Sequence, residues 1–431
     1  MKKKIPEGYK QTDVAVIPVE WDVTEIGDLN PFLTSGSRGW AKFYSDTGAP
    51  FIRITNMSRE SIYLDLSDLK LVNLPSGMNE GMRSQLQEHD ILISITADIG
   101  ITCYVNTSVP KPAYINQHIA LVRFAPHKIN SHFVSYFLAS ENSQKLFRGS
   151  TDLGAKAGMS LLTVRKIMLA LPPLSEQKAI AQALSDVDAA IAELDRLITK
   201  KRNIKQGATQ QLLTGKKRLP GFSGEWEEKK LGEILDYIKG FAFKSKDYCS
   251  DGVRIIRVSD TTYNSVKDEN QIYIKNSKLC LYTNWQLQEN DLVLSTVGSK
   301  PPMYDSMVGK VVFIKKKYAG CLLNQNAVII RSKSNKDYKQ RLIYYHLTTK
   351  RYLRYIEVIF RGNANQANIT LADLLKFEIV LPPTKEEQQA IAQVLTDMDT
   401  EIEALEQKCD KYKAIKQGMM QELLTGRTRL V

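Results

Sequence analysis

The sequence predicts a mixed α/β protein in which two globular domains alternate with two long helices as an internal duplication. The main observation is a repeat: the segments 171–219 and 381–430 both begin with Leu-Pro-Pro, and about half of their aligned residues are identical. The second observation is that weaker matches precede each segment in the same order, as in EHDILIS (88–94) and ENDLVLS (289–295). Solenoid repeats run to only about 20–50 residues, so the repeated unit is a whole domain followed by a helix.

The predicted parts are a first domain at 1–170, a first spacer helix at 171–219, a second domain at 220–380 and a second spacer helix at 381–431. A chain of 431 residues has the length of two to three domains, each large enough for its own core. Because the helices are alike and the domains differ, we expect one shared scaffold that carries two separate specificities.

Both helical segments carry an apolar seam in which the spacing alternates between four and three residues, as in a coiled coil. A helix from about residue 175 to 214 would be roughly 60 Å long at 1.5 Å per residue. The seams indicate either that the two helices pair with each other or that each packs on its own domain. Periodicity does not decide between parallel and antiparallel pairing. The seam residues are Ile180, Leu184, Val187, Ile191, Leu194, Ile198, Ile391, Leu395, Met398, Ile402, Leu405 and Cys409.

Start and stop signals bound both helices. Each segment opens after Pro-Pro, and Ser175 or Thr384 is the expected N-cap residue. Leu-Leu-Thr-Gly ends each segment, and Gly215 and Gly426 suit the left-handed position after a helix.

A further glycine lies inside the last turns of each helix, at Gly207 and Gly418 in the repeated motif Ile-Lys-Gln-Gly. Glycine in a helix interior is less favourable than alanine by about 1 kcal/mol. The pair indicates either a close contact with a helix or partner, or a tolerated weak position.

Both domains are expected to combine short strands with helices. Runs rich in β-branched residues and bounded by Gly, Asn and Asp are typical of strands. Helical stretches are predicted at about 130–147 and 337–357. The predicted strands are 51–55, 91–96, 254–259, 291–297, 310–314 and 327–331.

The net charge of +12 is concentrated in the second domain, where 221–380 holds 25 Lys and Arg against 17 Asp and Glu. Such an excess favours nucleic acid as a partner through phosphate contacts, although a merely basic protein has the same composition. No apolar run approaches the roughly 18–20 residues of a membrane span, and the basic N-terminus lacks the apolar stretch of a secretory signal. Five scattered cysteines without a CxxC motif indicate reduced thiols in a cytoplasmic protein and argue against a zinc site.

Several polar residues are candidates for DNA contact because their side chains reach phosphates or base edges. Each also has a structural interpretation: the alternative role of the amides is to satisfy loop backbone groups, and that of Arg53 and Arg257 is to be outward-facing strand residues. The candidates are Arg53, Asn116, Gln117, Arg148, Lys156, Arg257, Lys300, Asn324, Gln325, Arg354, Arg361, Asn363 and Gln366.

Motifs for catalysis are missing. The sequence contains no GxxxxGK[ST], no GxGxxG after a strand and no HExxH, and its five histidines have no metal-ligand spacing. The nearest match is KPPMY (300–304), but an amino-methyltransferase loop needs Asp or Asn before Pro-Pro and an aromatic ring after it. A stand-alone DNA-modifying enzyme and a non-specific architectural coiled-coil DNA-binding protein are the alternative functions.

The complete layout resembles the specificity (S) subunit of type I restriction–modification systems. The resemblance covers essentially the whole chain, and its most specific parts are 171–219 and 381–430, with the motifs LPP…EQ.AIA, IKQG and LLTG. The loop before each helix also resembles the family, except that the first copy has Lys156-Ala157 where an amide such as Gln366 is more usual.

The resemblance implies a non-catalytic subunit that binds double-stranded DNA. Each domain would be a target recognition domain for one half of an asymmetric bipartite site. The two helices would form an antiparallel coiled coil that sets the gap and docks two methyltransferase (M) subunits. Those partners would bind S-adenosylmethionine and methylate adenine, and motor-nuclease (R) subunits would join for restriction. The chain itself would hold no cofactor, metal or catalytic residue, and no membrane partner is implied.

Overall fold

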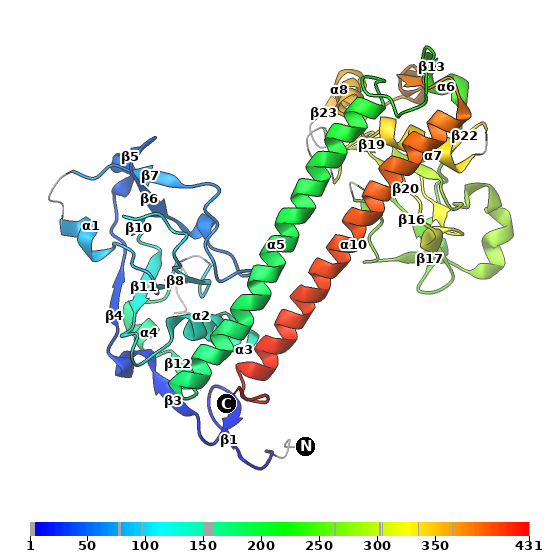
Figure 1. The fold of residues 1–431 in the computed structure, drawn as a ribbon. Coiled ribbons are helices and arrows are strands. Elements are labelled where there is room, and N and C mark those ends of the chain that lie inside the picture. The colour runs from blue at the N-terminus through cyan, green and yellow to red at the C-terminus, as the bar shows by residue number, and fades with distance from the viewer. Residues whose placement is uncertain are drawn as a thin grey trace. The chain divides into compact units, whose positions relative to one another are not determined.

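The computed structural model describes residues 5–75, 79–96, 98–149, 158–262, 264–300, 303, 305–334, 336–363 and 366–430. It divides into two compact units, drawn in Figure 1: unit 1 is Met1–Asp195 with Gln407–Val431, and unit 2 is Arg196–Glu406. Two long helices, α5 (Leu174–Leu212) and α10 (Lys385–Leu423), each contribute to both units. Each compact unit therefore contains one domain, the start of its own helix and the end of the other repeat's helix.

Unit 1 contains two four-stranded sheets. One is antiparallel with the order β4-β11-β8-β9, and in the other, β10-β6-β7-β5, only β10 and β6 are parallel. Two-stranded pairs β1-β2 and β12-β3 complete the described sheets. The strands are β1 (Tyr9–Gln11), β2 (Val16–Pro18), β3 (Asp22–Glu25), β4 (Phe32–Ser35), β5 (Tyr44–Ser45), β6 (Ala49–Ile52), β7 (Lys70–Val72), β8 (Ile91–Ser94), β9 (Thr102–Tyr104), β10 (Tyr114–Ile115), β11 (Ile119–Arg123) and β12 (Met168–Leu171).

Unit 2 repeats this plan. Its sheets have the orders β14-β22-β18-β20 and β21-β16-β17-β15, again with one parallel pair, β16 and β21, and β13 pairs with β25. Unit 2 also contains the described three-stranded sheet β19-β24-β23, and at the position equivalent to β19 in unit 1 Thr96 forms an antiparallel bridge with Gly158. The strands are β13 (Glu227–Lys230), β14 (Leu235–Lys239), β15 (Tyr248–Cys249), β16 (Val253–Ile256), β17 (Ile272–Ile274), β18 (Leu292–Ser295), β19 (Val297–Gly298), β20 (Val311–Phe313), β21 (Leu322–Leu323), β22 (Ala327–Ser332), β23 (Arg361–Asn363), β24 (Gln366–Asn368) and β25 (Glu378–Leu381).

The predicted helical stretches are present, but each is divided into two helices. In unit 1, Ser140 takes an extended conformation (ψ 153°) between two helices, and in unit 2 Thr349 is extended (ψ 156°) and its hydroxyl accepts a hydrogen bond from the Tyr352 amide at 3.2 Å. Such a side-chain cap begins a new helix. The short α-helices are α1 (Asn79–Arg83), α2 (Ser131–Ala139), α3 (Glu141–Gly149), α4 (Leu161–Arg165), α6 (Leu231–Ile234), α7 (Asp337–His346), α8 (Lys350–Ile359) and α9 (Leu371–Leu374).

Within each unit the two long helices run antiparallel. In unit 1, Asp188 pairs with Lys416 at 2.6 Å and Asp195 with Lys413 at 3.9 Å, so rising numbers on α5 meet falling numbers on α10. In unit 2, Lys201 pairs with Glu401 and the later residue Arg218 pairs with the earlier residue Glu387, so rising numbers again meet falling numbers. The antiparallel arrangement expected from the family resemblance is therefore confirmed within each unit.

The seam residues divide between two roles. Ile180 and Leu184 are fully buried in the unit 1 core together with Leu423 and Leu424 from the end of α10. In unit 2, Ile391, Leu395, Leu212 and Leu213 share a core. The described seam residues are all buried or half-buried. The helices thus pack on their own domains at one end and against each other along the seam, so both interpretations of the pattern hold.

The helix ends follow the predicted signals with one exception. The Thr384 hydroxyl accepts a hydrogen bond from the Glu387 amide at 3.3 Å, and Gly215 and Gly426 take the left-handed conformation (φ +66° and +67°). The prediction of Ser175 as an N-cap is wrong, because α5 begins one residue earlier at Leu174.

A reciprocal pair of buried ion pairs closes the two units. The Arg429 guanidinium donates to both oxygens of Glu176 at 2.7 and 2.9 Å, and that carboxylate is 1% exposed. In unit 2, Arg218 binds Glu387 in the same two-pronged way, and the Glu387 carboxylate is 0% exposed. We call each of these pairs a clasp, because the end of one repeat is held at the start of the other repeat's helix.

Removing the arginine of a clasp should destabilise one unit selectively. The variant Arg218→Ala leaves the buried Glu387 carboxylate without its charge partner, which costs about 3 kcal/mol. We expect urea unfolding to show this loss in unit 2 and Arg429→Ala to show it in unit 1. The matched control is Arg427→Ala, which breaks an exposed pair with Glu422 and should change stability by no more than about 0.5 kcal/mol. Equal effects of Arg218→Ala and Arg427→Ala would contradict the clasp.

A buried histidine makes the stability of unit 2 sensitive to acid. Burial, and then the charge of Arg351, lowers the pKa of His346 to about 3, and its side chain is 5% exposed. The unfolded chain binds a proton at a pKa of about 6.5, so stability is lost as pH falls from about 6.5 towards 3.

Replacing this histidine should weaken that dependence. Between pH 7 and pH 5 we expect His346→Phe to lose about 2 kcal/mol less stability than the unmodified protein, as measured by urea unfolding at both pH values. The same substitution at the exposed His127 is the control. A parallel pH profile for His346→Phe and the unmodified protein would contradict the burial argument.

Candidate DNA interface

The two candidate arginines that follow strands β6 and β16, Arg53 and Arg257, are held by contacts inside their own domains. β6 ends at Ile52 and β16 at Ile256, so the prediction that Arg53 and Arg257 lie within strands is wrong. Both residues lie where the chain leaves the strand for a short 3₁₀ helix, η3 (Ile54–Asn56) or η5 (Val258–Asp260). In each, the side chain at the end of the 3₁₀ helix accepts a hydrogen bond from the arginine's own amide.

The Arg257 guanidinium is bound most firmly. Its Nε and Nη2 donate to the carboxylate of Asp260 at 2.7–3.1 Å, and Nη2 also donates to the Asn270 carbonyl at 2.8 Å. The hydrogen bonds to Asp260 raise the pKa of Arg257. Arg53 donates to the Asp68 carbonyl at 3.2 Å. These contacts favour a structural role for both arginines.

The Asn-Gln pairs occupy equivalent turns that follow β10 and β21. The side-chain oxygen of Asn116 accepts from the His118 amide at 3.1 Å, and that of Asn324 accepts from the Gln325 amide at 2.8 Å. Both asparagines therefore satisfy loop backbone groups. Gln325 is exposed, and Gln117 is half-buried with its amide 2.9 Å from the His118 ring. Of the four amides, Gln325 is the one most available to DNA.

Glycines hold these turns against the neighbouring strand ends. A Cβ atom at Gly36 would lie 2.1 Å from the Ile115 carbonyl oxygen, and one at Gly240 would lie 1.9 Å from that of Asn324. Any side chain at either position would displace the turn. The two Asn-Gln turns are therefore placed by the same close backbone contact in both domains.

The remaining candidates in unit 2 gather near the hairpin of β23 and β24. Arg354 on α8 is exposed, and Arg361 is 67% exposed although its Nη2 lies 3.0 Å from Asp373. Asn363 and Gln366 are register partners at the tip of the hairpin, and their side chains lie outside the described part. Lys300 is exposed. Among the described residues, the hairpin thus presents Arg361 to solvent.

The corresponding candidates in unit 1 are Arg148 and Lys156. Arg148 belongs to α3, but its side chain lies outside the described part, as does the whole of Lys156. The loop KPPMY is also outside it except for Lys300 and Met303.

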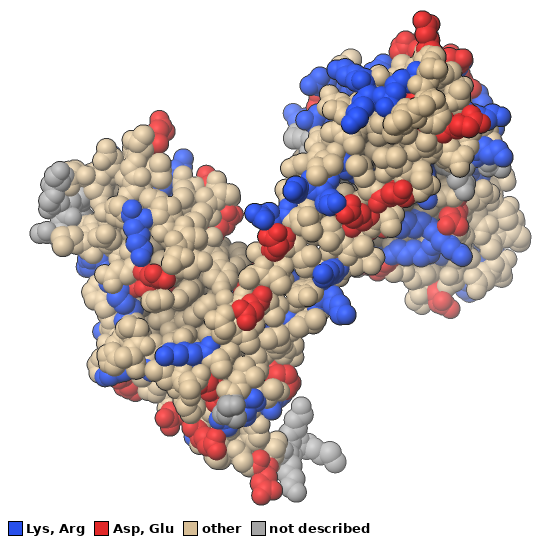
Figure 2. Space-filling model, viewed as in Figure 1, with Lys and Arg blue, Asp and Glu red and all other residues tan. Residues whose placement is uncertain are grey.

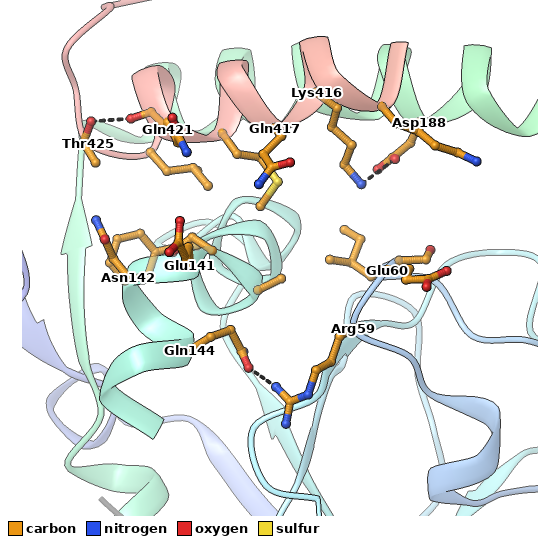
Figure 3. A pocket seen from close by; sticks show the side chains of 18 of the residues that line it. Arg59, Glu60, Glu141, Asn142, Gln144, Asp188, Lys416, Gln417, Gln421 and Thr425 are labelled. Carbon is orange, nitrogen blue, oxygen red and sulfur yellow. Dashed lines mark hydrogen bonds and ion pairs between the residues drawn. The ribbon is translucent and has the colours of Figure 1, made fainter. Parts of the chain in front are cut away.

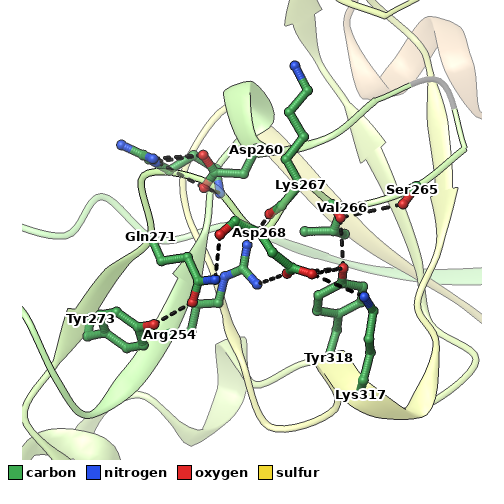
Figure 4. Close-up of polar contacts among 11 residues, drawn as sticks. Arg254, Asp260, Ser265, Val266, Lys267, Asp268, Gln271, Tyr273, Lys317 and Tyr318 are labelled. Atoms are coloured by element: carbon green, nitrogen blue, oxygen red, sulfur yellow. Dashed lines mark hydrogen bonds and ion pairs between the residues drawn. The ribbon is translucent and has the colours of Figure 1, made fainter. Parts of the chain in front are cut away.

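A cluster in unit 2 shows how the domain neutralises part of its positive charge (Figure 4). Arg254 donates to the Asp268 carboxylate at 2.7 Å and Lys317 does so at 3.2 Å, and the hydrogen bond from Arg254 is the main reason that the pKa of Asp268 is lowered. Lys267 is exposed, and its side chain points away from the cluster. It is a phosphate candidate that sequence reasoning missed, because only the fold separates it from its paired neighbours.

The charge distribution agrees with local pairing. On the face drawn in Figure 2, Lys and Arg side chains are interspersed with Asp and Glu over the domains and along the helices. Net charge therefore overstates the number of cations available for phosphate binding.

A cavity of about 1020 Å³ in unit 1 separates the domain from the helices (Figure 3). One wall is α3 with the segment around Arg59, and the other is formed by α5 and α10. Arg59 binds Asp98 and Gln144 and donates to the Ile99 carbonyl at 2.8 Å, while Lys416 is paired with Asp188. Lys413 and Arg427 also line the cavity and are paired with Asp195 and Glu422, so all four lining cations have acidic or polar partners within the chain, which argues against a phosphate site here.

Matching polar networks tie each domain to both long helices. In unit 1 the Tyr136 hydroxyl of α2 donates to Asp188 of α5 at 2.6 Å, and the other oxygen of that carboxylate binds Lys416 of α10 at 2.6 Å. In unit 2, Tyr345 of α7 donates to Asp399 at 2.9 Å, and Lys205 completes the network. Burial and the neighbouring carboxylate raise the pKa of both tyrosines.

Sequence reasoning missed these networks, although the identical spacing of their Asp and Lys residues in the two repeats was the available signal. They position each domain on its helices.

Because Arg257 has a structural role, replacing it should lower stability more than replacing the exposed Gln325 of the same domain. Arg257→Ala should lower the stability of unit 2 by about 2 kcal/mol, because the Asp260 carboxylate beneath it is 5% exposed and loses its charge partner. Gln325→Ala removes an exposed amide and should change stability by less than about 0.5 kcal/mol. Tryptophan fluorescence during urea unfolding measures both. Unchanged stability of Arg257→Ala with loss of DNA binding would instead make Arg257 a DNA contact.

Among the described residues, no helix is long and apolar enough to cross a membrane. No group of three or more His, Cys, Asp or Glu side chains in that same part is placed to hold a metal ion.

Known proteins resemble the chain over most of its length. The model of the type I restriction modification DNA specificity domain matches twice, at 18–205 and 223–414. A putative type I restriction enzyme MjaX specificity subunit from Methanocaldococcus jannaschii is 26% identical over 98% of this chain and 97% of its own. The MjaVIII specificity subunit from the same organism is 28% identical over 61% of this chain, which spans 63% of that relative's length.

Solved structures show the same fold. An S subunit of a type I restriction–modification system from M. genitalium superposes with a TM-score of 0.62 at 12% identity, over 97% of both chains. A chain from a structure of a type I R-M system complex gives a TM-score of 0.51 at 16% identity, over 96% of this chain and 99% of that one. The family model matches the chain twice, the sheets of unit 1 and unit 2 have equivalent strand orders, and the long helix is repeated. These findings lead to one assignment. The chain belongs to the type I restriction–modification DNA specificity family, as a specificity subunit that recognises DNA and does not itself carry out catalysis.

Proposed function

We propose that this chain reads an asymmetric two-part DNA site in the cytoplasm, one half with each domain. It directs adenine methylation by two methyltransferase subunits and restriction by motor-nuclease subunits. The observation that carries the proposal is the combination of equal strand order in the two units with different side chains at equivalent positions. Equal backbones supply two equivalent readers, and different side chains give the two readers different targets.

The domain parts and their surfaces support separate reading. We assign the recognition domains to about 1–170 and 220–380 and the spacer helices to 171–219 and 381–431. In unit 2, the hairpin of the sheet β19-β24-β23 begins with the exposed Arg361, and the preceding helix α8 carries the exposed Arg354. Arginine reads guanine and phosphate, and amides such as that of Gln325 read adenine. The two half-sites should therefore differ in sequence.

Two other functions make different predictions. A stand-alone methyltransferase or nuclease would act on DNA without partners, so methyl transfer from S-adenosylmethionine by the purified chain alone would contradict the proposal. An architectural DNA-binding protein would bind all sequences equally, with an affinity that falls with salt. Base-specific reading instead predicts a site that outcompetes random DNA by orders of magnitude at fixed salt.

The decisive measurement is co-expression of the chain with an adenine methyltransferase subunit of such a system, followed by mapping of methylated adenines in the host DNA. We expect a two-part motif with a fixed gap that disappears when the chain is omitted. Loss of one good amide–base contact is worth about 1–3 kcal/mol of discrimination, so Gln325→Ala should relax one half-site only. The matched variant Gln117→Ala should relax the other half or neither. A single continuous motif would contradict two independent readers.

A further inference from the structure

Unit 2 contains a buried lysine whose charge is held by the backbone of two separate loops. Lys310 immediately precedes β20 and is 2% exposed. Its Nζ atom donates a hydrogen bond to the Thr261 carbonyl oxygen at 2.6 Å and another to the Asp305 carbonyl oxygen. Burying an ammonium is costly unless it is hydrogen-bonded, and hydrogen bonds from a charged donor are stronger than neutral ones. The ammonium therefore joins two segments that are distant in the sequence, and we call this contact the loop clamp.

Unit 1 has an apolar residue at the place of this lysine. The Ser94 amide donates to the Ile101 carbonyl at 2.9 Å, and the Ser295 amide donates to the Lys310 carbonyl at 3.0 Å, so Ile101 and Lys310 are equivalent. Met57 follows η3 just as the first acceptor of the loop clamp follows η5. Ile101 and Met57 belong to one apolar core. Since the same backbone plan is built with two apolar side chains in unit 1, the fold itself does not require the lysine in unit 2.

The first clamped segment carries one of the exposed cations of unit 2. Thr261 forms an antiparallel bridge with Val266, and the amide of the next residue, Lys267, donates to the Asp260 carbonyl at 2.6 Å. The Lys267 side chain is exposed and points away from the neighbouring ion pairs (Figure 4). A fixed Thr261 thus fixes the backbone from which Lys267 extends.

The second clamped segment carries another exposed cation, Lys300. This loop is closed at Ser299, whose carbonyl accepts from the Val308 amide at 2.9 Å and whose hydroxyl accepts from the Ser306 hydroxyl at 2.9 Å. A Cβ atom at Gly298 would lie 2.3 Å from the Ser306 carbonyl oxygen, so the two sides of the loop are in close backbone contact. Lys300 follows the closing residue and is exposed. The clamp on the adjoining Asp305 carbonyl therefore fixes the base of the loop that carries Lys300.

We propose that Lys310 is a positioning residue for DNA recognition by unit 2; this rests on the proposed function. The loop clamp holds the segments of Lys267 and Lys300 at one spacing, so both cations can meet phosphates of one duplex without first being ordered. Phosphate contacts fix the orientation of a protein on DNA and thereby place its base-reading side chains. Lys310 acts on recognition in this way without touching DNA. Because unit 1 has Ile101 at this place, the effect is confined to the half-site that unit 2 reads.

The acid–base behaviour of the clamp gives it a distinctive signature. Burial, assisted by the charge of Lys267 and opposed by that of Asp305, lowers the pKa of Lys310 to about 8 from a usual value of 10.5. As pH rises from 7 to 9 the ammonium loses its proton, and its hydrogen bonds lose their charge assistance. Because the pKa is lower in the folded than in the unfolded chain, the contribution of Lys310 to stability rises over this range. Recognition by unit 2 should therefore weaken while its stability does not.

The test uses the full chain in complex with the methyltransferase subunit and DNA that carries the two-part site found by methylation mapping. Competitor duplexes have one half-site or the other replaced, and binding is compared at fixed salt. The variant Lys310→Met removes the charge with an unbranched apolar side chain, and Ile101→Met at the equivalent place in unit 1 is the matched control. At pH 7 we expect Lys310→Met to lose about tenfold in discrimination at one half-site, as for one hydrogen bond to a charged group, and Ile101→Met to lose none.

Two further readouts distinguish positioning from a general loss of structure. The melting temperature of Lys310→Met should be unchanged or higher, because an apolar side chain replaces a buried charge. In the unmodified protein, discrimination at that same half-site should fall between pH 7 and pH 9, and in Lys310→Met it should be independent of pH.

The outcomes separate this inference from the proposed function. Unchanged discrimination by Lys310→Met, with a two-part site still read by the unmodified complex, would overturn the positioning role and leave the proposed function intact. A lower melting temperature with equal losses at both half-sites would show a purely structural role and also overturn it. An unmodified complex that reads no two-part site would overturn both.

Discussion

The fold depends on the two buried clasps, each of which joins the end of one repeat to the beginning of the other repeat's helix. Glu176 and Glu387 are almost completely buried, and a buried carboxylate is stable only with its charge satisfied. Arg429 and Arg218 supply that charge and thereby bring the last residues of each repeat back to the opposite domain. The core leucines and the left-handed glycine of each LLTG motif, which precede the arginine, are brought to the opposite domain with it, and Gly426 lies against Trp21. Neither unit is complete without a segment from the other repeat.

On this shared scaffold, the two domains keep one backbone plan with different side chains. The ring of His132 stacks on Tyr104 with a centroid distance of 4.3 Å in unit 1, and in unit 2 the guanidinium of Arg341 lies 4.9 Å from the ring of Phe313 at the equivalent place. Two different packing chemistries thus support the same helix on the same sheet. A backbone that tolerates such exchange can also accept different residues on its DNA-reading surface, which is what two separate specificities require.

Each long helix uses its sides for different contacts. The seam packs against the other helix or the domain core, and a neighbouring strip binds the domain through Asp188 and Tyr136 or through Asp399 and Tyr345. The remaining side is exposed and holds the bare glycine of the IKQG motif. The repetition of all three sides in both helices explains why the helices are alike although the domains are not: they hold two domains in the same way, while only the domains need to differ.

The sequence by itself determined the duplication, the two helices with their glycine stops and the main strands, because periodicity and end signals act over a few neighbouring residues. It also carried the motifs that identify the family. The tertiary structure decided what depends on distant partners: the antiparallel sense of the helices, the clasps, and the division of polar residues between structure and surface. Arg257 and Asn324 have the side chains of DNA readers, yet one holds a buried carboxylate and the other a loop amide. Only the folded chain brings such partners within hydrogen-bonding distance, so composition and spacing could not assign these roles.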